Sequence, residues 1–203
     1  RCLKKALEIE SKIVVVISSP FIHLSEQWIR EFDKLDVSSD KVLADSSQNR
    51  WRDKLVDSIL DVENGISQKL IVLTTHNTFS SADFMNIIRE SKKRVPQLKF
   101  LLIVDEVHGI GAPERRNGLI EEYDYRLGLS ATPKRWFDFE GTDKIFGYFG
   151  DVVFEFSLKD AIDKGYLSPY IYKPHFTSLT PQEMEKMVRG VGFEPTNPCG
   201  TAA

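Results

Sequence analysis

The stretch Phe100-Leu101-Leu102-Ile103-Val104-Asp105-Glu106-Val107-His108 decides the fold, because an unbroken apolar run leads directly into two carboxylates. Such a run without alternation predicts a strand buried on both faces, as in parallel sheets covered by helices. Those sheets carry their chemistry at the carboxyl ends of the strands, where Asp105 and Glu106 fall. Two acids there suit phosphate chemistry, in which one holds Mg²⁺ and the other orients or deprotonates a water. The alternative is a buried strand that merely ends in solvated acids.

The composition is that of an ordinary globular protein. The chain has 203 residues, of which 41% are hydrophobic and 28% charged, enough for one well-cored domain with an appendage. With a net charge of −3, the chain has no overall excess of basic residues that would favour binding to nucleic acid. Cys2 and Cys199 stand at opposite ends and the histidines are scattered, which predicts no zinc site and fits a reducing cytoplasm. No apolar run approaches the roughly 20 residues of a membrane helix, so we expect no membrane partner and a cytoplasmic location.

Further strands and helices alternate along the chain. Apolar runs predict strands at 13–17, 41–44, 70–73 and within 126–133, and alternation predicts another at 152–156. Helical spacing predicts helices at 3–9, 23–35, 50–62, 84–88, 119–123 and 158–164. Strands separated by helices predict an α/β fold, with a parallel sheet sandwiched between helices and right-handed crossovers.

Several helix ends carry recognisable capping residues. Gly65 is expected to end the helix at 50–62. Ser81 or Asp83 is expected to cap the helix through 84–88, and Ser157 the helix at 158–164.

Polar side chains gather where four of the predicted strands end. The tips are Ser18-Ser19, Thr74-Thr75-His76-Asn77, Asp105-Glu106-Val107-His108 and Ser130-Ala131-Thr132. In a parallel sheet these tips share one edge and can form a single surface. Small donors ahead of helix N-termini suit phosphate oxygens, whether of a nucleotide or of a nucleic-acid backbone.

The four tips resemble, in order, motifs of the first RecA-like motor domain of superfamily-two helicases. The DEVH segment at 105–108 is similar to the DEAD/DEAH-type box, and 130–132 is similar to the SAT motif downstream of it. Ser19-Pro20 with Leu24, Gln27 and Trp28 resembles the motif after the second strand, and 74–77 resembles the nucleic-acid-contact motif. Segments 163–167 and 179–181 resemble the exit from this domain in helicases of the XPB, UvrB and type III restriction kind. The resemblance covers residues 1–187 and implies a RecA-like fold of the P-loop NTPase type.

The resemblance implies a role for each residue at the two downstream tips. Asp105 would hold the magnesium of MgATP, and Glu106 would position and activate the attacking water. His108 would link the nucleotide site to Ser130 and Thr132, which couple hydrolysis to nucleic-acid movement. Simpler alternatives are a histidine bonded to a loop carbonyl and a plain turn at 130–132. A hydrolase triad of Ser130, His108 and Asp105 is disfavoured because the sequence has no Gly-x-Ser-x-Gly elbow.

The upstream tips are implied to contact nucleic acid. Ser19, Gln27 and Thr75 would bind the strand backbone, and we expect DNA rather than RNA as the partner. Amides and hydroxyls suffice for such contacts, so a mildly acidic chain is compatible with them. Trp28 is expected to pack within its helix rather than stack on a base, and His76 is expected to be a solvated residue at a loop tip.

Phosphoryl transfer also needs a phosphate cradle, which the family supplies as Gly-x-x-x-x-Gly-Lys-Ser/Thr. The sequence contains no such stretch. We therefore expect an N-terminally truncated first motor domain at 1–168 and, at 169–188, the start of a linker toward a missing second RecA-like domain. Residues 189–203 are expected to be a disordered tail, because they show no periodicity and are rich in turn formers. The tail is expected to lie outside the family, because Gly-Phe-Glu-Pro-Thr at 192–196 resembles the translated T-arm of a transfer-RNA gene.

The function implied is that of an ATP-dependent DNA helicase or translocase, an enzyme that uses ATP and Mg²⁺. This chain alone is expected to be inactive. The alternative is a non-catalytic nucleic-acid-binding remnant of a helicase gene.

Overall fold

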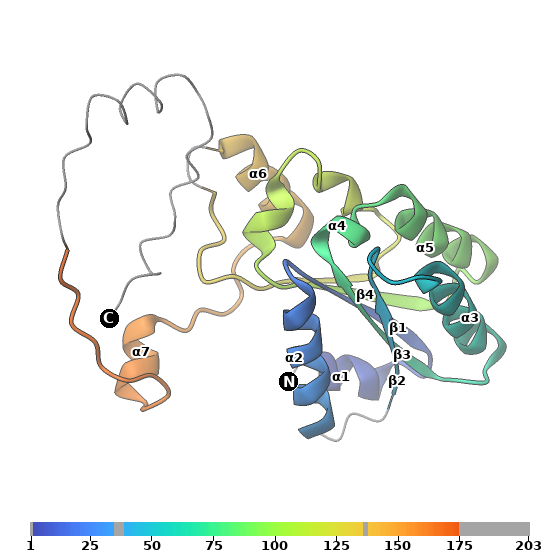
Figure 1. The fold of residues 1–203 in the computed structure, drawn as a ribbon, viewed down its shortest axis with the longest axis horizontal. Helices are drawn as coiled ribbons and strands as arrows, with labels where there is room; N and C mark the ends of the chain where they lie inside the picture. The colour runs from blue at the N-terminus through green and yellow to red at the C-terminus, as the bar shows by residue number, and fades with distance from the viewer. Residues whose placement is uncertain (1, 35–38, 136–137, 175–203) are drawn as a thin grey trace. The chain divides into compact units, whose positions relative to one another are not determined.

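The chain divides into two compact units, residues 1–151 and 152–203. The computed structural model describes residues 2–34, 39–135 and 138–174. The first unit holds the sheet and the helices that cover it (Figure 1). The predicted division at residue 168 stays a prediction, and most of the predicted linker and the whole predicted tail lie outside the described residues.

The first unit is built on one parallel sheet. Its strands are β1 (Ile13–Ser19), β2 (Asp40–Ala44), β3 (Lys69–Thr75), β4 (Lys99–Val104) and β5 (Tyr125–Gly128). They lie in the order β2-β3-β1-β4-β5, and every neighbouring pair is parallel. The predicted parallel α/β sheet is therefore confirmed, with the unbroken apolar runs of β1, β3 and β4 at its centre.

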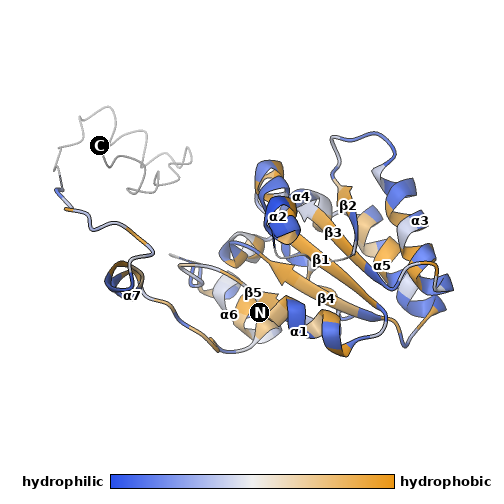
Figure 2. Ribbon diagram, turned by 90° about the horizontal axis from the view of Figure 1, so that it is seen from below, coloured by the Kyte–Doolittle hydropathy of each residue, from blue (hydrophilic) through white to orange (hydrophobic). Residues whose placement is uncertain are grey.

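Helices cover both faces of this sheet. The α-helices of this unit are α1 (Cys2–Ile9), α2 (Ile22–Lys34), α3 (Trp51–Asn64), α4 (His76–Phe79), α5 (Ala82–Arg94) and α6 (Phe139–Phe149), with short 3₁₀ turns η1 (Val107–Gly111) and η2 (Arg116–Gly118). The second unit contains α7 (Leu158–Asp163). Odd-numbered β1 residues such as Val15 pack with Leu7 of α1 and Phe32 of α2. Even-numbered residues such as Val16 pack with α3, α5 and α6. The strands are accordingly the most hydrophobic ribbons, while the helices mix polar and apolar positions (Figure 2).

The predicted caps are confirmed. The Ser81 hydroxyl accepts from the amide of Phe84, and Gly65 ends α3 at φ 77°, a left-handed conformation that suits glycine. Ser157 and Asp160 form a reciprocal capping box at the start of α7.

Two predicted elements are wrong. Residues 152–156 form no strand, because alternation is only a local signal and a strand also needs a partner strand to complete its ladder. Residues 119–123 form no helix, because the amides of Leu119 and Ile120 donate back to the Arg116 and Gly118 carbonyls and so continue the η2 turn.

Helix α6 was not predicted, because its two glycines lower its helix propensity. Tertiary packing explains one of them. A Cβ on Gly141 would lie 2.8 Å from the Gly111 carbonyl oxygen, so only glycine lets α6 pack against η1. The Asp138 side chain caps this helix by accepting from the Gly141 amide at 2.7 Å.

Within the described ranges, no helix combines the length and apolar character needed to cross a membrane.

The predicted solvated position of His76 is wrong. His76 begins α4, which turns the chain back against the sheet, and the side chain is only 1% exposed. Its Nδ1 shares a hydrogen bond of 2.8 Å with the Ser18 hydroxyl of β1. Burial lowers the pKa of His76 to about 4, and the positive charge of Arg115 adds to this effect. The imidazole is therefore neutral in the folded protein.

His76 makes stability depend on pH. Because its pKa falls from 6.5 in the unfolded chain to about 4 in the folded one, its contribution is complete above pH 6.5 and is lost as the pH falls toward 4. We expect a loss of up to about 3 kcal/mol across that window. Urea unfolding of wild type and His76→Gln from pH 7 to pH 4.5 checks this. A difference between the two proteins that does not change with pH would contradict it.

A buried and a partly buried tyrosine together test hydrogen bonding. The Tyr123 hydroxyl is buried and has no hydrogen-bond partner in the described part of the chain, whereas the Tyr148 hydroxyl donates to the Ile120 carbonyl. We expect Tyr123→Phe to leave the free energy of unfolding unchanged or to raise it, and Tyr148→Phe to lower it by about 1 kcal/mol. Denaturant unfolding of the two variants measures both, and a larger loss for Tyr123→Phe would refute the assignment.

Candidate functional site

The carboxyl ends of the strands form one row of polar groups. Ser18 lies opposite both Thr74 and Val104 in the sheet, and Val104 lies opposite Gly128. The residues that follow these positions therefore emerge side by side along one edge. The four predicted tips meet there, in the order of the strands β3, β1, β4 and β5.

Asp105 is held at its backbone and at both carboxylate oxygens. Its amide donates to the Ser18 carbonyl at 2.8 Å, which extends the pairing of β4 with β1 by one residue. Oδ1 accepts from the Glu106 amide at 3.1 Å, and Oδ2 accepts from Nε1 of Trp28 at 3.3 Å. The carboxylate therefore has a defined orientation at the sheet edge.

Glu106 has a left-handed backbone conformation, with φ 49° and ψ 52°. A residue with a Cβ pays roughly 1–2 kcal/mol for this conformation. The surrounding bonds hold it there, because the Val107 amide donates to the Leu129 carbonyl at 2.9 Å. The Glu106 side chain remains half exposed and reaches toward His108, whose Nδ1 lies 3.4 Å from Oε2. Backbone strain at one acid of a pair is typical of a functional turn.

The structure brings His108 and Ser130 together. Nδ1 of His108 and the Ser130 hydroxyl share a hydrogen bond of 3.1 Å, and the same hydroxyl accepts from the Thr132 amide at 3.1 Å. The Thr132 side chain is exposed. Asp105 makes no hydrogen bond to His108 among the described contacts, so a Ser130–His108–Asp105 triad is not assembled.

Arg135 is a site residue that the sequence did not reveal. Its guanidinium donates to the His108 carbonyl and, through Nε at 2.6 Å, to Asp138 at the start of α6. It therefore fastens the segment after 130–132 to the turn that carries the acids. No spacing pattern singles it out, because it follows the SAT-like segment among other polar residues.

Trp28 is the second missed site residue. Its packing role is confirmed, since its ring lies 5.5 Å from that of Phe32 and joins the core on that face. Its indole N–H, however, reaches the carboxylate of Asp105. Its place in the motif-like segment with Ser19 and Gln27 put Trp28 near the site, but nothing in the sequence identified Asp105 as the partner of its indole.

The three residues predicted to contact nucleic acid differ in how accessible their side chains are. Ser19 is fully buried, and its hydroxyl is bonded to Ser25 at 3.0 Å and to the Phe21 carbonyl. The Thr75 hydroxyl donates to Asp45 at 3.1 Å and is half-buried. Gln27 is exposed on α2. The hydroxyls of Ser19 and Thr75 are thus occupied by hydrogen bonds within the protein, and of the three side chains only that of Gln27 is exposed to solvent.

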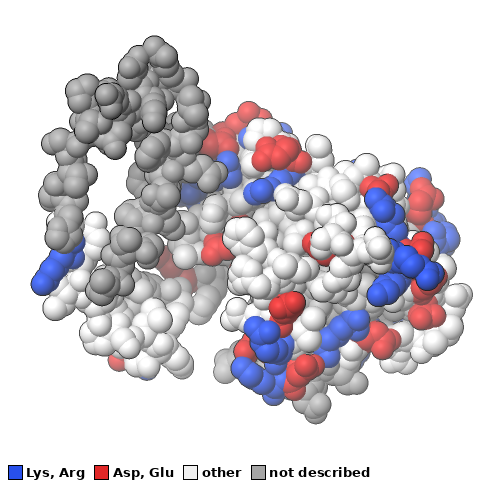
Figure 3. All heavy atoms as spheres, in the orientation of Figure 1, with Lys and Arg blue, Asp and Glu red and all other residues white. Residues whose placement is uncertain are grey.

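Charge on the molecular surface is mixed. On the face seen in Figure 3, basic and acidic side chains are interspersed, with both signs over α3. Any nucleic-acid contact on this face would rest on amides, hydroxyls and single cations rather than on a broad basic surface.

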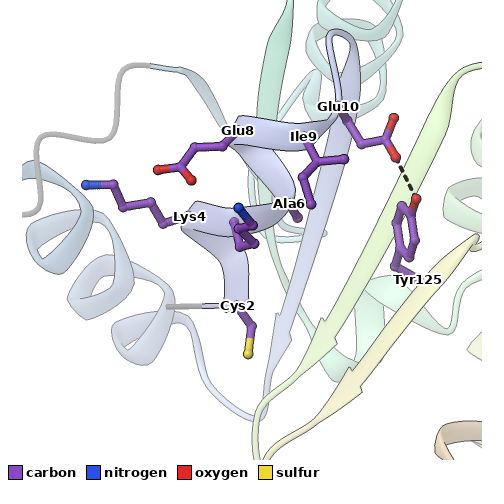
Figure 4. Close-up of a pocket in the computed structure, with 8 residues that line it drawn as sticks. Cys2, Lys4, Ala6, Glu8, Ile9, Glu10 and Tyr125 are labelled. Carbon is purple, nitrogen blue, oxygen red and sulfur yellow. Dashed lines mark hydrogen bonds between the residues drawn. The ribbon is translucent and has the colours of Figure 1, made fainter.

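A surface hollow of about 670 Å³ lies away from the acid pair. It is lined by α1 and by Tyr125 of β5, whose hydroxyl donates to Glu10 at 2.5 Å (Figure 4). Its walls are the chain's first helix and an edge strand, and none of the predicted site residues borders it.

The acid pair fits a metal only in partnership with a ligand. Among residues 2–34, 39–135 and 138–174, no group of three or more His, Cys, Asp or Glu side chains is arranged to hold a metal ion. One fixed carboxylate with free lone pairs suits an ion whose other ligands are phosphate oxygens and water, which is how Mg²⁺ is commonly bound.

Two proteins to which the chain is similar are restriction enzymes. The chain is 37% identical over 84 residues to a type I restriction enzyme EcoAI endonuclease subunit from Escherichia coli, a match that covers 39% of this chain and 10% of that subunit. The fold is similar to that of a nuclease-deletion mutant of the type ISP restriction-modification enzyme LlaGI in complex with a DNA substrate mimic. The TM-score is 0.52 at 18% identity, over 80% of this chain and 16% of the other.

The family model that matches is described as "Type III restriction enzyme, res subunit", and it matches residues 2–135, more than half of the chain. The matched range contains Asp105 and Glu106, which follow β4, and the SAT-like segment 130–132. The chain therefore belongs to the family of the type III restriction enzyme res subunit, and its fold is that of the first motor domain of a superfamily-two helicase.

Proposed function

We propose that this chain is the first motor domain of an ATP-driven translocase that moves on DNA. The observation that carries the proposal is the fixed acid pair at the end of β4 beside the His108–Ser130 hydrogen bond. Membership of a restriction-enzyme family supports it. The matched LlaGI structure contains a DNA substrate mimic, which favours DNA over RNA as the partner. Such work on DNA would take place in the cytoplasm.

Each residue of the pair has a separate task in this proposal. Asp105 would hold the Mg²⁺ of MgATP, because its carboxylate is fixed while part of its lone-pair capacity remains free. Bound there, the metal would neutralise charge that develops on the phosphates. Glu106 would orient and deprotonate the attacking water, since its side chain is half exposed beside Asp105.

A change at Asp105 and Glu106 would be transmitted to the downstream segment 130–132. Nδ1 of His108 lies within reach of both Glu106 Oε2 and the Ser130 hydroxyl, so a change at the acids would alter the bond to Ser130 and reach the segment that carries Thr132. A second RecA-like domain would complete the site and would close over the nucleotide. Gln27 would contact the DNA backbone, with Ser19 and Thr75 shaping the loops around it.

A second candidate is a non-catalytic nucleic-acid-binding remnant. The observation that favours it is the lack of a Gly-x-x-x-x-Gly-Lys-Ser/Thr stretch in the sequence. It would keep the fold and a weak affinity for nucleic acid without turnover.

ATP hydrolysis separates the two candidates. Lacking a phosphate-binding loop, the 203-residue chain is expected to show no turnover above background. If the gene read upstream to its initiator encodes such a loop, the longer product should hydrolyse ATP when DNA is added. Glu106→Gln should then lower kcat by at least about 100-fold, because it removes the base.

The control for that assay is Glu121→Gln, an exposed acid bonded to Arg126, which should keep the wild-type rate. Turnover by the longer product that is indifferent to Glu106→Gln would overturn the assigned role. Turnover by the 203-residue chain that Glu106→Gln abolishes would show that the chain needs no further loop.

DNA binding tests the proposed role of α2. We expect Gln27→Ala to weaken binding of single-stranded DNA to the chain about fivefold, the equivalent of roughly 1 kcal/mol for one lost hydrogen bond. Gln68→Ala is the matched control, because Gln68 is exposed just before β3, at the opposite edge of the sheet. Fluorescence anisotropy with a labelled oligonucleotide measures both variants, and equal affinities would remove Gln27 from the proposed contact surface.

A further inference from the structure

The residue that carries a further inference is Trp28. Its Nε1–H donates to Oδ2 of Asp105 at 3.3 Å, across 77 residues of sequence. The Glu106 amide occupies Oδ1. An ionised carboxylate offers about four lone-pair positions, so these two bonds fix its plane and leave the remaining positions pointing elsewhere.

The indole is itself held firmly. Its ring packs against Phe32 one turn along α2 and belongs to the core that covers one face of the sheet. The start of α2 is fastened to the end of β1 by the hydrogen bond between Ser25 and Ser19. The packing of the ring and the anchoring of α2 both hold the indole N–H beside Asp105.

Trp28 also lies next to Gln27, the exposed residue on the same helix. Successive residues of an α-helix point in directions about 100° apart, so one helix presents a polar side chain outward and a donor toward the acid pair. A ligand that displaces α2 at its exposed face would thus change the bond to the carboxylate.

We propose that Trp28 is a positioning residue that sets the orientation of the Asp105 carboxylate for metal binding and links it to α2. This inference rests on the proposed function, because it gives Asp105 the role of metal ligand. Trp28 does not touch the reacting atoms. It acts through Asp105, and only its N–H is required, so a phenylalanine at this position would keep the packing and lose the link.

The first experiment tests the contact in the chain alone. The indole N–H resonance of Trp28 is assigned in the ¹⁵N-labelled protein by its loss in Trp28→Phe. Asp105→Asn should move that resonance upfield, because an amide oxygen is a weaker acceptor than a carboxylate. Asp33→Asn is the matched control, since it makes the same change on α2 at an exposed acid that pairs with Lys41. An unmoved indole resonance in Asp105→Asn overturns the inference.

The second experiment tests positioning for a metal, with Mn²⁺ as the probe. Because the acid pair fits a metal only together with phosphate oxygens, paramagnetic broadening of the Glu106 amide is followed while MnCl₂ is titrated, at a fixed excess of ATP, into wild type and into Trp28→Phe. The variant should need a several-fold higher Mn²⁺ concentration for half-broadening. A thermal unfolding midpoint near that of wild type shows that the variant is folded.

The outcomes separate the inference from the proposed function. Equal Mn²⁺ dependence in wild type and Trp28→Phe overturns the positioning role while the metal role of Asp105 stands. Broadening in wild type that Asp105→Asn does not weaken overturns the metal role, and the positioning role fails with it. An indole shift in the first experiment together with weaker Mn²⁺ binding by Trp28→Phe supports the inference.

Discussion

The parallel register around β1 is the constraint on which the rest of this structure depends. β1 is buried along its whole length and pairs with β3 on one side and β4 on the other. Alternate residues of each strand face opposite layers of helices, so a shift of one residue would exchange the two cores. The hydrogen bond from the Asp105 amide to the Ser18 carbonyl continues this register beyond the last pair of β4. The position of the acid pair is therefore a property of the sheet.

Beyond the sheet, the turn that carries the acids is held from several directions. Trp28 reaches Asp105 from α2, the Leu129 carbonyl accepts from Val107, and Arg135 donates to the carbonyl of His108. These bonds explain how Glu106 keeps a left-handed backbone conformation that is unfavourable for a residue with a side chain. They also mean that three separate segments can influence the same two carboxylates.

The polar residues at the sheet edge divide into two kinds. The hydroxyls of Ser19 and Thr75 and Nδ1 of His76 point into the fold, where they bond to Ser25, Asp45 and Ser18 respectively. Gln27, Glu106 and Thr132 keep side chains accessible from outside. A buried polar group is costly unless it is paired, so the first kind stabilises the loops and the second kind is available to ligands. Resemblance to a motif does not distinguish the two kinds, because both are polar residues at the same tips.

By itself, the sequence determined the strands, most helices, the sandwich and the edge at which chemistry gathers. These follow from local patterns: unbroken apolar runs, helical spacing, and caps such as Ser81 and Gly65, each of which acts within a few residues. Only the tertiary structure decided that His76 is buried, that α6 packs through Gly141, and that Trp28 and Arg135 reach the acid turn. Each of these depends on a partner distant in sequence, and no pattern along the chain records which distant residue the fold will bring near.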